Sequence, residues 1–166
     1  RLHSLEEGDQ NKLKKEWKYI IDKSFNDDSS FEERISDKEQ YRPERVFFIS
    51  HKEDGPVATA TAWYRPKFGE STGYLHMVGA LPSHSGKGLG LQVSLAALYK
   101  IREEGKKSAV LETDDFRIPA IITYLKLGFK PILVHENQKD RWQKIINKVD
   151  RPDLAVEIPE EIKPFE

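Results

Sequence analysis

Apolar residues near the start of the chain recur at the spacing of a helix. They are separated by three or four positions and so share one helical face: Leu13, Trp17, Ile20, Ile21 and Phe25. Asp9 stands just before this run, where a side-chain oxygen can cap free helical amides. The pattern therefore predicts an amphipathic helix after Asp9. A second, short helix is expected over residues 31–39, ending before the extended stretch that Pro43 imposes.

Runs of β-branched and aromatic residues predict a β-hairpin and three further strands. The hairpin comprises residues 45–52 and 57–64, which are joined by the turn Glu53-Asp54-Gly55-Pro56. The further strands are expected over residues 72–80, 109–113 and 129–135. Pro131 lies near the start of the last one, where a missing N–H is tolerated best.

Glycines mark the ends of two predicted helices in the second half of the chain. A long buried helix over residues 89–104 is closed by Gly105, and a helix over residues 118–127 is stopped by Gly128. Asn137 is expected to cap a final helix. These elements predict one domain over residues 1–150. Residues 151–166 have no period and form a C-terminal extension, either packed on the domain or mobile.

The strand at 72–80 leads into a glycine-rich turn, Ser85-Gly86-Lys87-Gly88-Leu89-Gly90, which opens the long helix. Backbone amides can converge on a phosphate where no Cβ intervenes, and the first N–H groups of a helix add the positive end of its dipole. Lys87 adds a positive charge. The turn therefore predicts a phosphate-binding site, although a strand-to-helix turn that binds nothing fits the spacing as well.

Two other phosphate-binding loops do not match this turn. A P-loop needs Lys and then Ser or Thr before its helix, whereas Gly90 is followed by Leu91-Gln92. A dinucleotide-binding fingerprint needs G-x-G-x-x-G, whereas this turn has G-x-G-x-G and follows a hairpin.

Composition narrows the classes of function. The net charge of −1 argues against an extended basic surface, so no nucleic-acid partner is expected. The absence of Cys excludes disulfides and cysteine nucleophiles and is consistent with a cytoplasmic protein. No uncharged run is long enough to span a membrane. His3, His51 and His135 show no ligand spacing, so no metal is expected.

Two segments of the chain, residues 75–105 and 114–129, resemble the central motifs of the GNAT acetyltransferase superfamily. The first motif is Arg or Gln, two residues, Gly, one residue, then Gly or Ala. It matches at Gly88 and Gly90, with Ser85 at the Arg or Gln position. The second motif matches in the run Tyr124-Leu125-Lys126-Leu127-Gly128-Phe129 and at Ala120, with Arg117 in place of the usual Asn.

The resemblance implies an α/β (α+β) fold whose central sheet is mixed, mostly antiparallel, splayed at the cofactor site and flanked by helices. It implies an N-acetyltransferase that moves an acetyl group from acetyl-CoA to a primary amine of a small molecule, amino acid or peptide by direct attack. Residues 75–78 would then pair with the pantetheine arm as an added strand does, unless they only pair within the sheet. The implied coenzyme-binding residues are Met77, Val78, Gly79, Ser85, Gly86, Lys87, Gly88, Leu89, Gly90, Leu91, Arg117, Ala120 and Tyr124.

The resemblance also suggests catalytic residues. Tyr124 matches the tyrosine that in many family members protonates the departing thiolate, although core packing is the alternative. The general base is left open between His76 and Glu112, each of which could instead make a structural hydrogen bond. A backbone N–H near Val78 or Gly79 is the implied oxyanion stabiliser. His84, before the glycine turn, could contact phosphate.

The acceptor amine is not identified by the sequence. Aromatic residues before the central strand and on the early helices either line an acceptor cleft or pack in the core: Trp17, Phe31, Trp63 and Tyr64. Asp114 and Asp115 either attract a cationic amine or cap a helix. Homodimer formation is left open. Two rival functions remain, a non-catalytic acyl-CoA-binding domain, which Ser85 and Arg117 suggest, and a protein-interaction domain.

Overall fold

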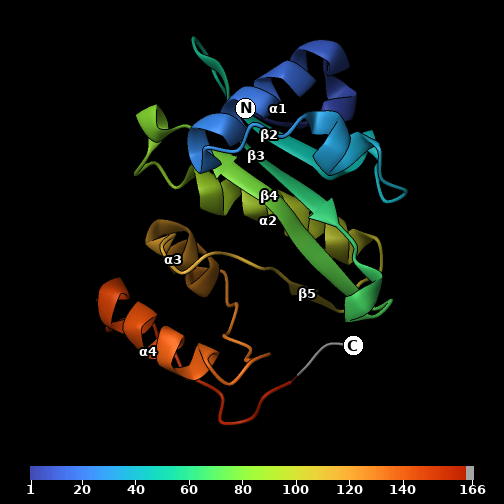
Figure 1. The fold of residues 1–166 in the computed structure, drawn as a ribbon. Coiled ribbons are helices and arrows are strands. Elements are labelled where there is room, and N and C mark those ends of the chain that lie inside the picture. The colour runs from blue at the N-terminus through green and yellow to red at the C-terminus, as the bar shows by residue number, and fades with distance from the viewer. Residues whose placement is uncertain (164–166) are drawn as a thin grey trace. The chain divides into compact units, whose positions relative to one another are not determined.

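The computed structural model describes residues 1–163 of the chain (Figure 1). It divides into two compact units, of which the first spans Arg1–Leu111 and the second begins at Glu112. No helix of the described part combines the length and the apolar character that crossing a bilayer requires.

A five-stranded sheet forms the centre of the first unit. Its strands follow one another in chain order, β1-β2-β3-β4-β5. The first four are antiparallel neighbours, and β5 joins β4 in parallel. This confirms the mixed, mostly antiparallel sheet and the hairpin that the sequence predicts. The strands are β1 (Leu2–Ser4), β2 (Val46–His51), β3 (Gly55–Trp63), β4 (Thr72–Ala80) and β5 (Ser108–Val110).

Two long helices cover the sheet, α1 (Gln10–Phe25) and α2 (Leu89–Glu103). Figure 1 shows them on opposite sides of the strands. Asp9 caps α1 as predicted, because its side chain accepts a hydrogen bond from the Lys12 amide at 3.1 Å. The predicted apolar stripe of α1 is buried at Leu13, Trp17, Ile20 and Ile21.

Two glycines of β4 let the helices approach the sheet closely. A Cβ on Gly73 would lie 2.3 Å from Cγ2 of Ile101 in α2. A Cβ on Gly79 would lie 3.1 Å from Cδ1 of Ile21 in α1. Residues six positions apart on a regular strand share a face, so these opposite contacts require an irregularity between Gly73 and Gly79.

Short helical turns complete the first unit. They are η1 (Leu5–Glu7), η2 (Glu32–Ser36), η3 (Pro43–Arg45), η4 (Pro66–Phe68) and η5 (Pro82–His84). The predicted helix over 31–39 is wrong in length, because only the five residues of η2 are helical, as a wide π turn closed by Asp37 N–H on Glu32 O at 3.0 Å. The strand predicted over 109–113 ends at Val110.

The second unit contains two helices, α3 (Ile118–Lys126) and α4 (Gln138–Val149). They share an apolar cluster that centres on Ile121, Ile145 and Val149. Asn137 is the N-cap residue of α4, as expected, but its side chain makes no capping bond. The side chain of Gln138 instead accepts the Val134 amide at 2.7 Å.

The strand predicted over residues 129–135 is not formed. Within it, only Leu133 makes a β-bridge, in parallel with Ile162. Pro131 offers no N–H to a ladder, so the apolar pattern of this segment has little backbone pairing to support it. Of the predicted extension over residues 151–166, the described part, 151–163, is irregular apart from that bridge, and residues 164–166 lie outside the described part.

Candidate active site

The second half of β4 is hydrogen-bonded on one side only within the described residues. β5 pairs with Thr72, Gly73 and Tyr74, and then ends at Val110. β4 itself continues to Ala80 and keeps only β3 as its neighbour. The sheet is thus splayed between β4 and β5, and the backbone from Leu75 onward presents a strand edge to which an extended ligand can be added.

A β-bulge interrupts the same half of β4. The register with β3 runs from Thr59 opposite Gly79 to Thr61 opposite His76, so Met77 and Val78 together face Ala60. Met77 adopts φ 50°, a left-handed conformation that a side chain rarely takes. The extra residue turns the following side chains to the other face, which explains the opposite contacts of Gly73 and Gly79. A bulge also leaves backbone groups out of the ladder.

The glycine turn continues directly from η5 into α2. Gly86 and Gly88 have φ 76° and 69°, conformations that glycine takes without strain. Gly88 is the N-cap of α2 and supplies no capping side chain, so the amides of the first helical turn are not satisfied by a cap. Residues 85–88 are exposed. The positive end of the α2 dipole therefore faces an open surface.

The glycines of this turn are not covered by other side chains. A Cβ on Gly86 or Gly90 would meet no heavy atom within 4 Å, and one on Gly88 would meet only Nε2 of Gln92 at 4.0 Å. The protein's own side chains therefore leave the backbone accessible. Lys87 is exposed within the turn and can add a positive charge. The pyrophosphate of coenzyme A has the charge and size that such a helix N-terminus binds.

His76 is buried beside the bulge. Its ring stacks on Trp63, with centroids 5.1 Å apart, and its Nε2 donates to the carbonyl oxygen of Arg34 at 3.3 Å. Burial lowers the pKa of His76 from 6.5 to about 4, because desolvation penalises the charged ring. The ring is therefore neutral at pH 7. Its Nδ1 can accept a proton, but a pKa this low makes His76 a weak base.

Tyr124 lies in α3 of the second unit and packs edge-to-face on Phe129, with ring centroids 6.1 Å apart. Burial raises the pKa of Tyr124 to about 12, against a smaller lowering by the charge of Arg117. The phenol therefore keeps its proton at neutral pH, as a proton donor must.

The other candidates of the second unit are placed as follows. Arg117 is the N-cap residue of α3 and donates from Nε to Asp114 at 2.9 Å. Ala120 lies within the first turn of α3. Glu112 was expected on a strand, but it is exposed and follows the end of β5, because that strand is shorter than predicted.

The acidic pair at 114–115 is engaged by arginines. Asp114 pairs with Arg117, and Asp115 accepts two hydrogen bonds from Arg141, at 2.8 and 2.7 Å. The hydrogen bond from Arg141 lowers the pKa of Asp115. Neither carboxylate caps α3, so the predicted capping role is wrong.

The early aromatic residues form core rather than a cleft. Trp17 and Phe31 are fully buried and pack edge-to-face with centroids 5.2 Å apart. Trp63 is also buried, against His76. Tyr64 instead lies under the ammonium of Lys106, which is 4.5 Å from its ring centroid.

Two histidines that are distant in sequence lie together in the first unit, which sequence spacing did not indicate. His84 is buried, and its Nε2 lies 3.1 Å from an oxygen of Asp54. His51 approaches the same oxygen at 3.0 Å. His84 is thus held by Asp54, although the sequence left it free to contact phosphate. No spacing along the chain signals this group, because a strand-to-helix connection brings His84 back to the β2–β3 turn.

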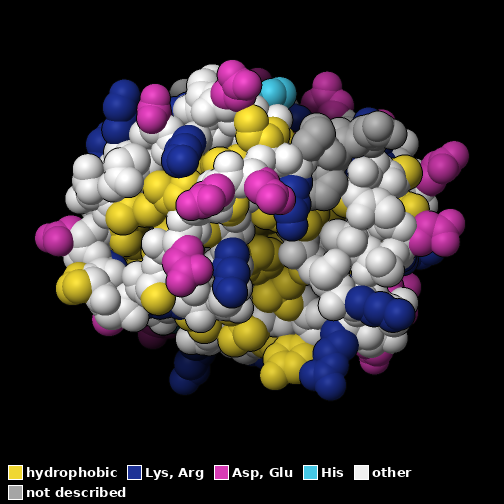
Figure 2. All heavy atoms as spheres, turned by 90° about the horizontal axis from the view of Figure 1, so that it is seen from below, with side chains coloured by type: hydrophobic (Ala, Val, Ile, Leu, Met, Phe, Trp, Pro, Cys, Tyr) yellow, Lys and Arg dark blue, Asp and Glu magenta, His cyan; other side chains and the backbone are white. Residues whose placement is uncertain are grey.

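Charges of both signs are mixed on the surface in Figure 2, where Lys and Arg alternate with Asp and Glu across the face shown. Hydrophobic side chains are visible between them. On this face, no broad basic area of the kind that binds nucleic-acid phosphates is seen.

Comparison with known proteins identifies the family. The sequence model of the acetyltransferase (GNAT) family matches residues 12–129, which include β4, the glycine turn and α3. The chain therefore belongs to the acetyltransferase (GNAT) family, as its motifs predict.

Curated relatives match over a shorter segment. The mycothiol acetyltransferase of Nocardia farcinica is 41% identical over 59 residues, 36% of this chain and 20% of that protein. The mycothiol acetyltransferase of Saccharomonospora viridis is 36% identical over 64 residues, 39% of this chain and 21% of that protein. The matched segment thus spans about a fifth of the length of these relatives.

Solved structures share the fold at low identity. The ribosomal-protein-S18-alanine N-acetyltransferase from Escherichia coli is 18% identical, with a TM-score of 0.59 over 81% of this chain and 82% of that one. A Mycobacterium tuberculosis protein solved in complex with CoA is 12% identical, with a TM-score of 0.57 over 92% of this chain and 90% of that one. These similarities confirm the predicted GNAT-type fold.

Proposed function

We propose that this chain is an N-acetyltransferase, which transfers the acetyl group of acetyl-CoA to a primary amine by direct attack. The amine belongs to a small molecule, an amino acid or a peptide. Membership of the family supports an acyltransferase, and the absence of Cys leaves no thiol for a covalent acyl-enzyme.

The observation that carries this proposal is one continuous backbone track in the first unit. It begins at the edge of β4 from Leu75 onward, which has no strand partner within the described residues, passes through η5 and ends at the uncapped amides at the start of α2. A strand edge suits the amide groups of a pantetheine arm, and a helix N-terminus suits a diphosphate. Both lie on the same stretch of chain, in the order in which coenzyme A carries these groups.

Each part of the track has a distinct task in the proposed mechanism. Backbone groups of Met77, Val78 and Gly79 are proposed to align the pantetheine arm, and a backbone N–H near Val78 or Gly79 is the proposed donor to the thioester oxygen. The amides from Gly86 to Leu91, with Lys87, hold the pyrophosphate, and Ser85 contributes where relatives carry Arg or Gln. Arg117 and Ala120 are proposed pantetheine contacts by family resemblance.

Proton transfer completes the reaction. The attacking amine must lose a proton, and the leaving thiolate must gain one. Tyr124 is the proposed proton donor to the thiolate, and its raised pKa keeps it protonated until that step. The base is His76 or Glu112, acting directly or through water. The low pKa of His76 disfavours it as the direct acceptor from an ammonium.

A non-catalytic acyl-CoA-binding domain is the second candidate. Arg117 stands where relatives have Asn, and its guanidinium is paired with Asp114. Such a domain would bind the coenzyme on the same backbone track without turning it over.

Coenzyme binding is tested by the thermal midpoint with acetyl-CoA, because a ligand bound only by the folded state stabilises it. The chain should show a rise that Gly88→Val abolishes, since Val at φ 69° distorts the turn and blocks its backbone. Gly105→Val is the matched control, with a similar φ of 82° at the other end of α2. It should lose stability but keep the shift. Equal shifts in both variants would remove the turn from the proposal.

Catalysis is tested by thiol release from acetyl-CoA with a panel of free amino acids, peptide amines and small amines. Tyr124→Phe should lower kcat about 100-fold with little change in coenzyme affinity, the usual scale for losing a general acid. His76→Gln and Glu112→Gln, measured beside it, identify the base by the larger loss in kcat. Coenzyme binding without turnover of any amine would favour the non-catalytic candidate.

A further inference from the structure

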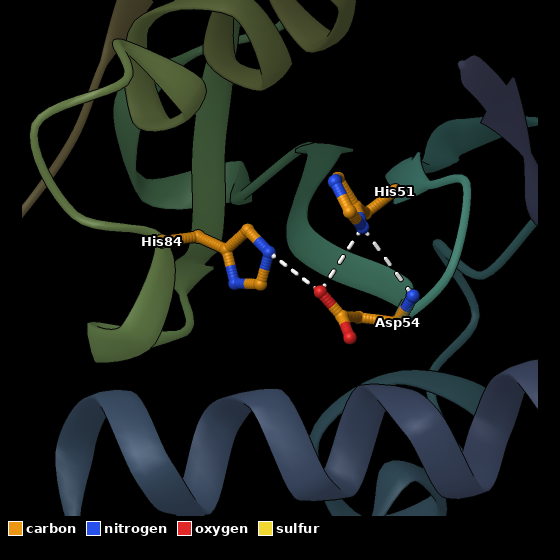
Figure 3. A group of neighbouring side chains, drawn as sticks. All are labelled: His51, Asp54 and His84. Atoms are coloured by element: carbon orange, nitrogen blue, oxygen red, sulfur yellow. Dashed lines mark hydrogen bonds and ion pairs between the residues drawn. The ribbon is translucent and has the colours of Figure 1, made fainter.

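The group of His51, Asp54 and His84 forms a compact side-chain cluster in the first unit (Figure 3). His51 is the last residue of β2, Asp54 lies in the β2–β3 turn, and His84 ends η5. Their potential ligand atoms all lie within 4.8 Å of one another. Figure 3 shows both imidazoles directed at the Asp54 carboxylate from separate elements.

The hydrogen bonds around the cluster show which of its nitrogens act as acceptors. His51 Nδ1 accepts the amides of Glu53 and Asp54 at 3.3 and 3.4 Å, so its one electron pair is shared between two long hydrogen bonds, which a bound metal ion would replace. It nevertheless lies 3.0 Å from Oδ2 of Asp54, which is also an acceptor. Two acceptor atoms at this distance repel each other unless a cation or a proton is shared between them.

The ring of His84 is held between Ser83 and Asp54. Its Nδ1 lies 3.1 Å from the Ser83 hydroxyl, and its Nε2 lies 3.1 Å from Oδ2 of Asp54. When Nδ1–H donates to Ser83, the free pair of Nε2 is directed at the cluster. A histidine whose second nitrogen is held by a hydrogen bond is the usual arrangement of a metal ligand, because that bond fixes the ring and its tautomer. Burial of His84 limits its motion further.

Two of the three separations between these atoms are close to those around a small transition-metal ion. Tetrahedral zinc with bonds of about 2.0–2.1 Å places neighbouring ligand atoms about 3.3 Å apart. The two nitrogen–oxygen separations here are 3.0 and 3.1 Å. All three atoms lie within 4.8 Å of one another, so binding requires the exposed His51 and Asp54 side chains to turn toward the buried His84. Two imidazoles and one carboxylate suit Zn²⁺, whereas Mg²⁺ and Ca²⁺ prefer oxygen ligands.

We propose that His51 Nδ1, Asp54 Oδ2 and His84 Nε2 bind a zinc ion, with solvent as the fourth ligand. The ion ties the β2–β3 turn to His84, the residue that precedes the Ser85–Gly90 turn. None of the three residues has a part in the proposed acyl transfer, so the role of the ion is to hold the connection between β4 and α2 in place. The proposal concerns three residues of the first unit and does not depend on the chain's acyl-transfer activity.

Isothermal titration of Zn²⁺ into the tag-free, metal-stripped chain tests this site in a non-coordinating buffer. The expected result is one ion per chain and a rise in thermal midpoint. Co²⁺ should give the visible absorption of a tetrahedral site, and Mg²⁺ should give no heat. Asp54→Asn and His84→Gln should each weaken Zn²⁺ binding at least 10-fold.

Control variants separate the cluster from ordinary surface histidines. His3→Gln and His135→Gln should bind Zn²⁺ as the parent does. Asp54 is exposed, so Asp54→Asn should fold normally, which its metal-free thermal midpoint and circular dichroism confirm. If the parent does not bind one Zn²⁺ ion, or if Asp54→Asn and His84→Gln bind it as tightly as the parent, the proposal is wrong.

Discussion

The two halves of β4 use the same strand for different purposes. From Thr72 to Tyr74 the strand pairs with β5, Tyr74 also lies opposite Trp63 of β3, and Gly73 packs tightly against Ile101 of α2. From Leu75 to Ala80 it keeps one neighbour, carries a bulge and holds Met77 at φ 50°. The first half is held by β5 and packs against α2, whereas within the described residues the second half leaves the edge opposite β3 open and contains a strained residue.

This difference shows that the half of β4 proposed to bind the coenzyme is also the half that contains backbone strain. Strain at a non-glycine residue costs on the order of 1–3 kcal/mol and persists only when the surrounding structure enforces it. Here α1 enforces it, because Gly79 packs against Ile20 and Ile21, and Ser24 Oγ donates to the Ala80 carbonyl at 3.0 Å. Local rules that hold in the first half fail in the half where the proposed coenzyme contacts lie.

The largest expected change in the free energy of unfolding comes from a substitution in the first half of β4. Gly73→Ala places a Cβ 2.3 Å from Ile101 Cγ2 in a packed interface and should lower the free energy of unfolding by about 3 kcal/mol. Urea denaturation measures the loss. Gly79→Ala is the matched variant in the second half, where the nearest atom is 3.0 Å away, and should cost less. Equal losses of unfolding free energy in the two variants would contradict the proposed difference in packing between the two halves of β4.

The stability of the fold should depend on pH because of His76, in the second half of β4. The unfolded chain binds a proton at His76 near pH 6.5, whereas the folded pKa is about 4. The stability that neutral His76 contributes is therefore complete above pH 6.5 and is lost as the pH falls toward 4. Between pH 7 and 5 the loss should be roughly 2 kcal/mol.

The contribution of His76 is isolated by comparing the parent with His76→Gln in urea denaturation at both pH values. Gln can still donate to the Arg34 carbonyl, but it does not titrate. The pH-dependent loss should therefore shrink in this variant. An unchanged loss would mean that the ring is not desolvated in solution.

The smallest effect on stability is expected at the bulge itself. Met77→Gly keeps the left-handed backbone without strain and should change the free energy of unfolding by less than about 1 kcal/mol. Met77→Val should lose about 1–2 kcal/mol, because a β-branched residue resists positive φ. Thiol release should survive Met77→Gly and fall in Met77→Val. If thiol release instead fell in Met77→Gly and survived in Met77→Val, the bulge would have no part in the proposed oxyanion contact.

The elements with strong local signals could be predicted from the sequence. The span of β4 was predicted to the residue, α1 begins at its predicted cap, and α2 and α3 end within a residue of prediction. In each case a periodic apolar run is bounded by a capping residue or a glycine, so pattern and boundary agree.

The features that the sequence did not predict correctly have no local pattern with a matching boundary residue. Residues 129–135 have the apolar character of a strand but only one bridge, because strand pairing depends on a neighbour that the local sequence does not specify. The bulge at Met77 and the meeting of His51 with His84 depend likewise on register and topology. The glycine turn before α2 was predictable because its residues are consecutive in the sequence, whereas its phosphate-binding role and the roles of His76, Glu112 and Tyr124 stay predictions.

The stacking of Trp63 on His76 gives the protein an internal optical reporter. The two rings are nearly parallel, at an interplanar angle of 26°. The other tryptophans are placed differently, with Trp17 in contact with Phe31 and Trp142 in the apolar cluster of the second unit. A positive charge on an imidazole perturbs an indole stacked against it. The fluorescence emission of Trp63 should therefore follow the proton occupancy of His76 in the intact chain, without an added dye.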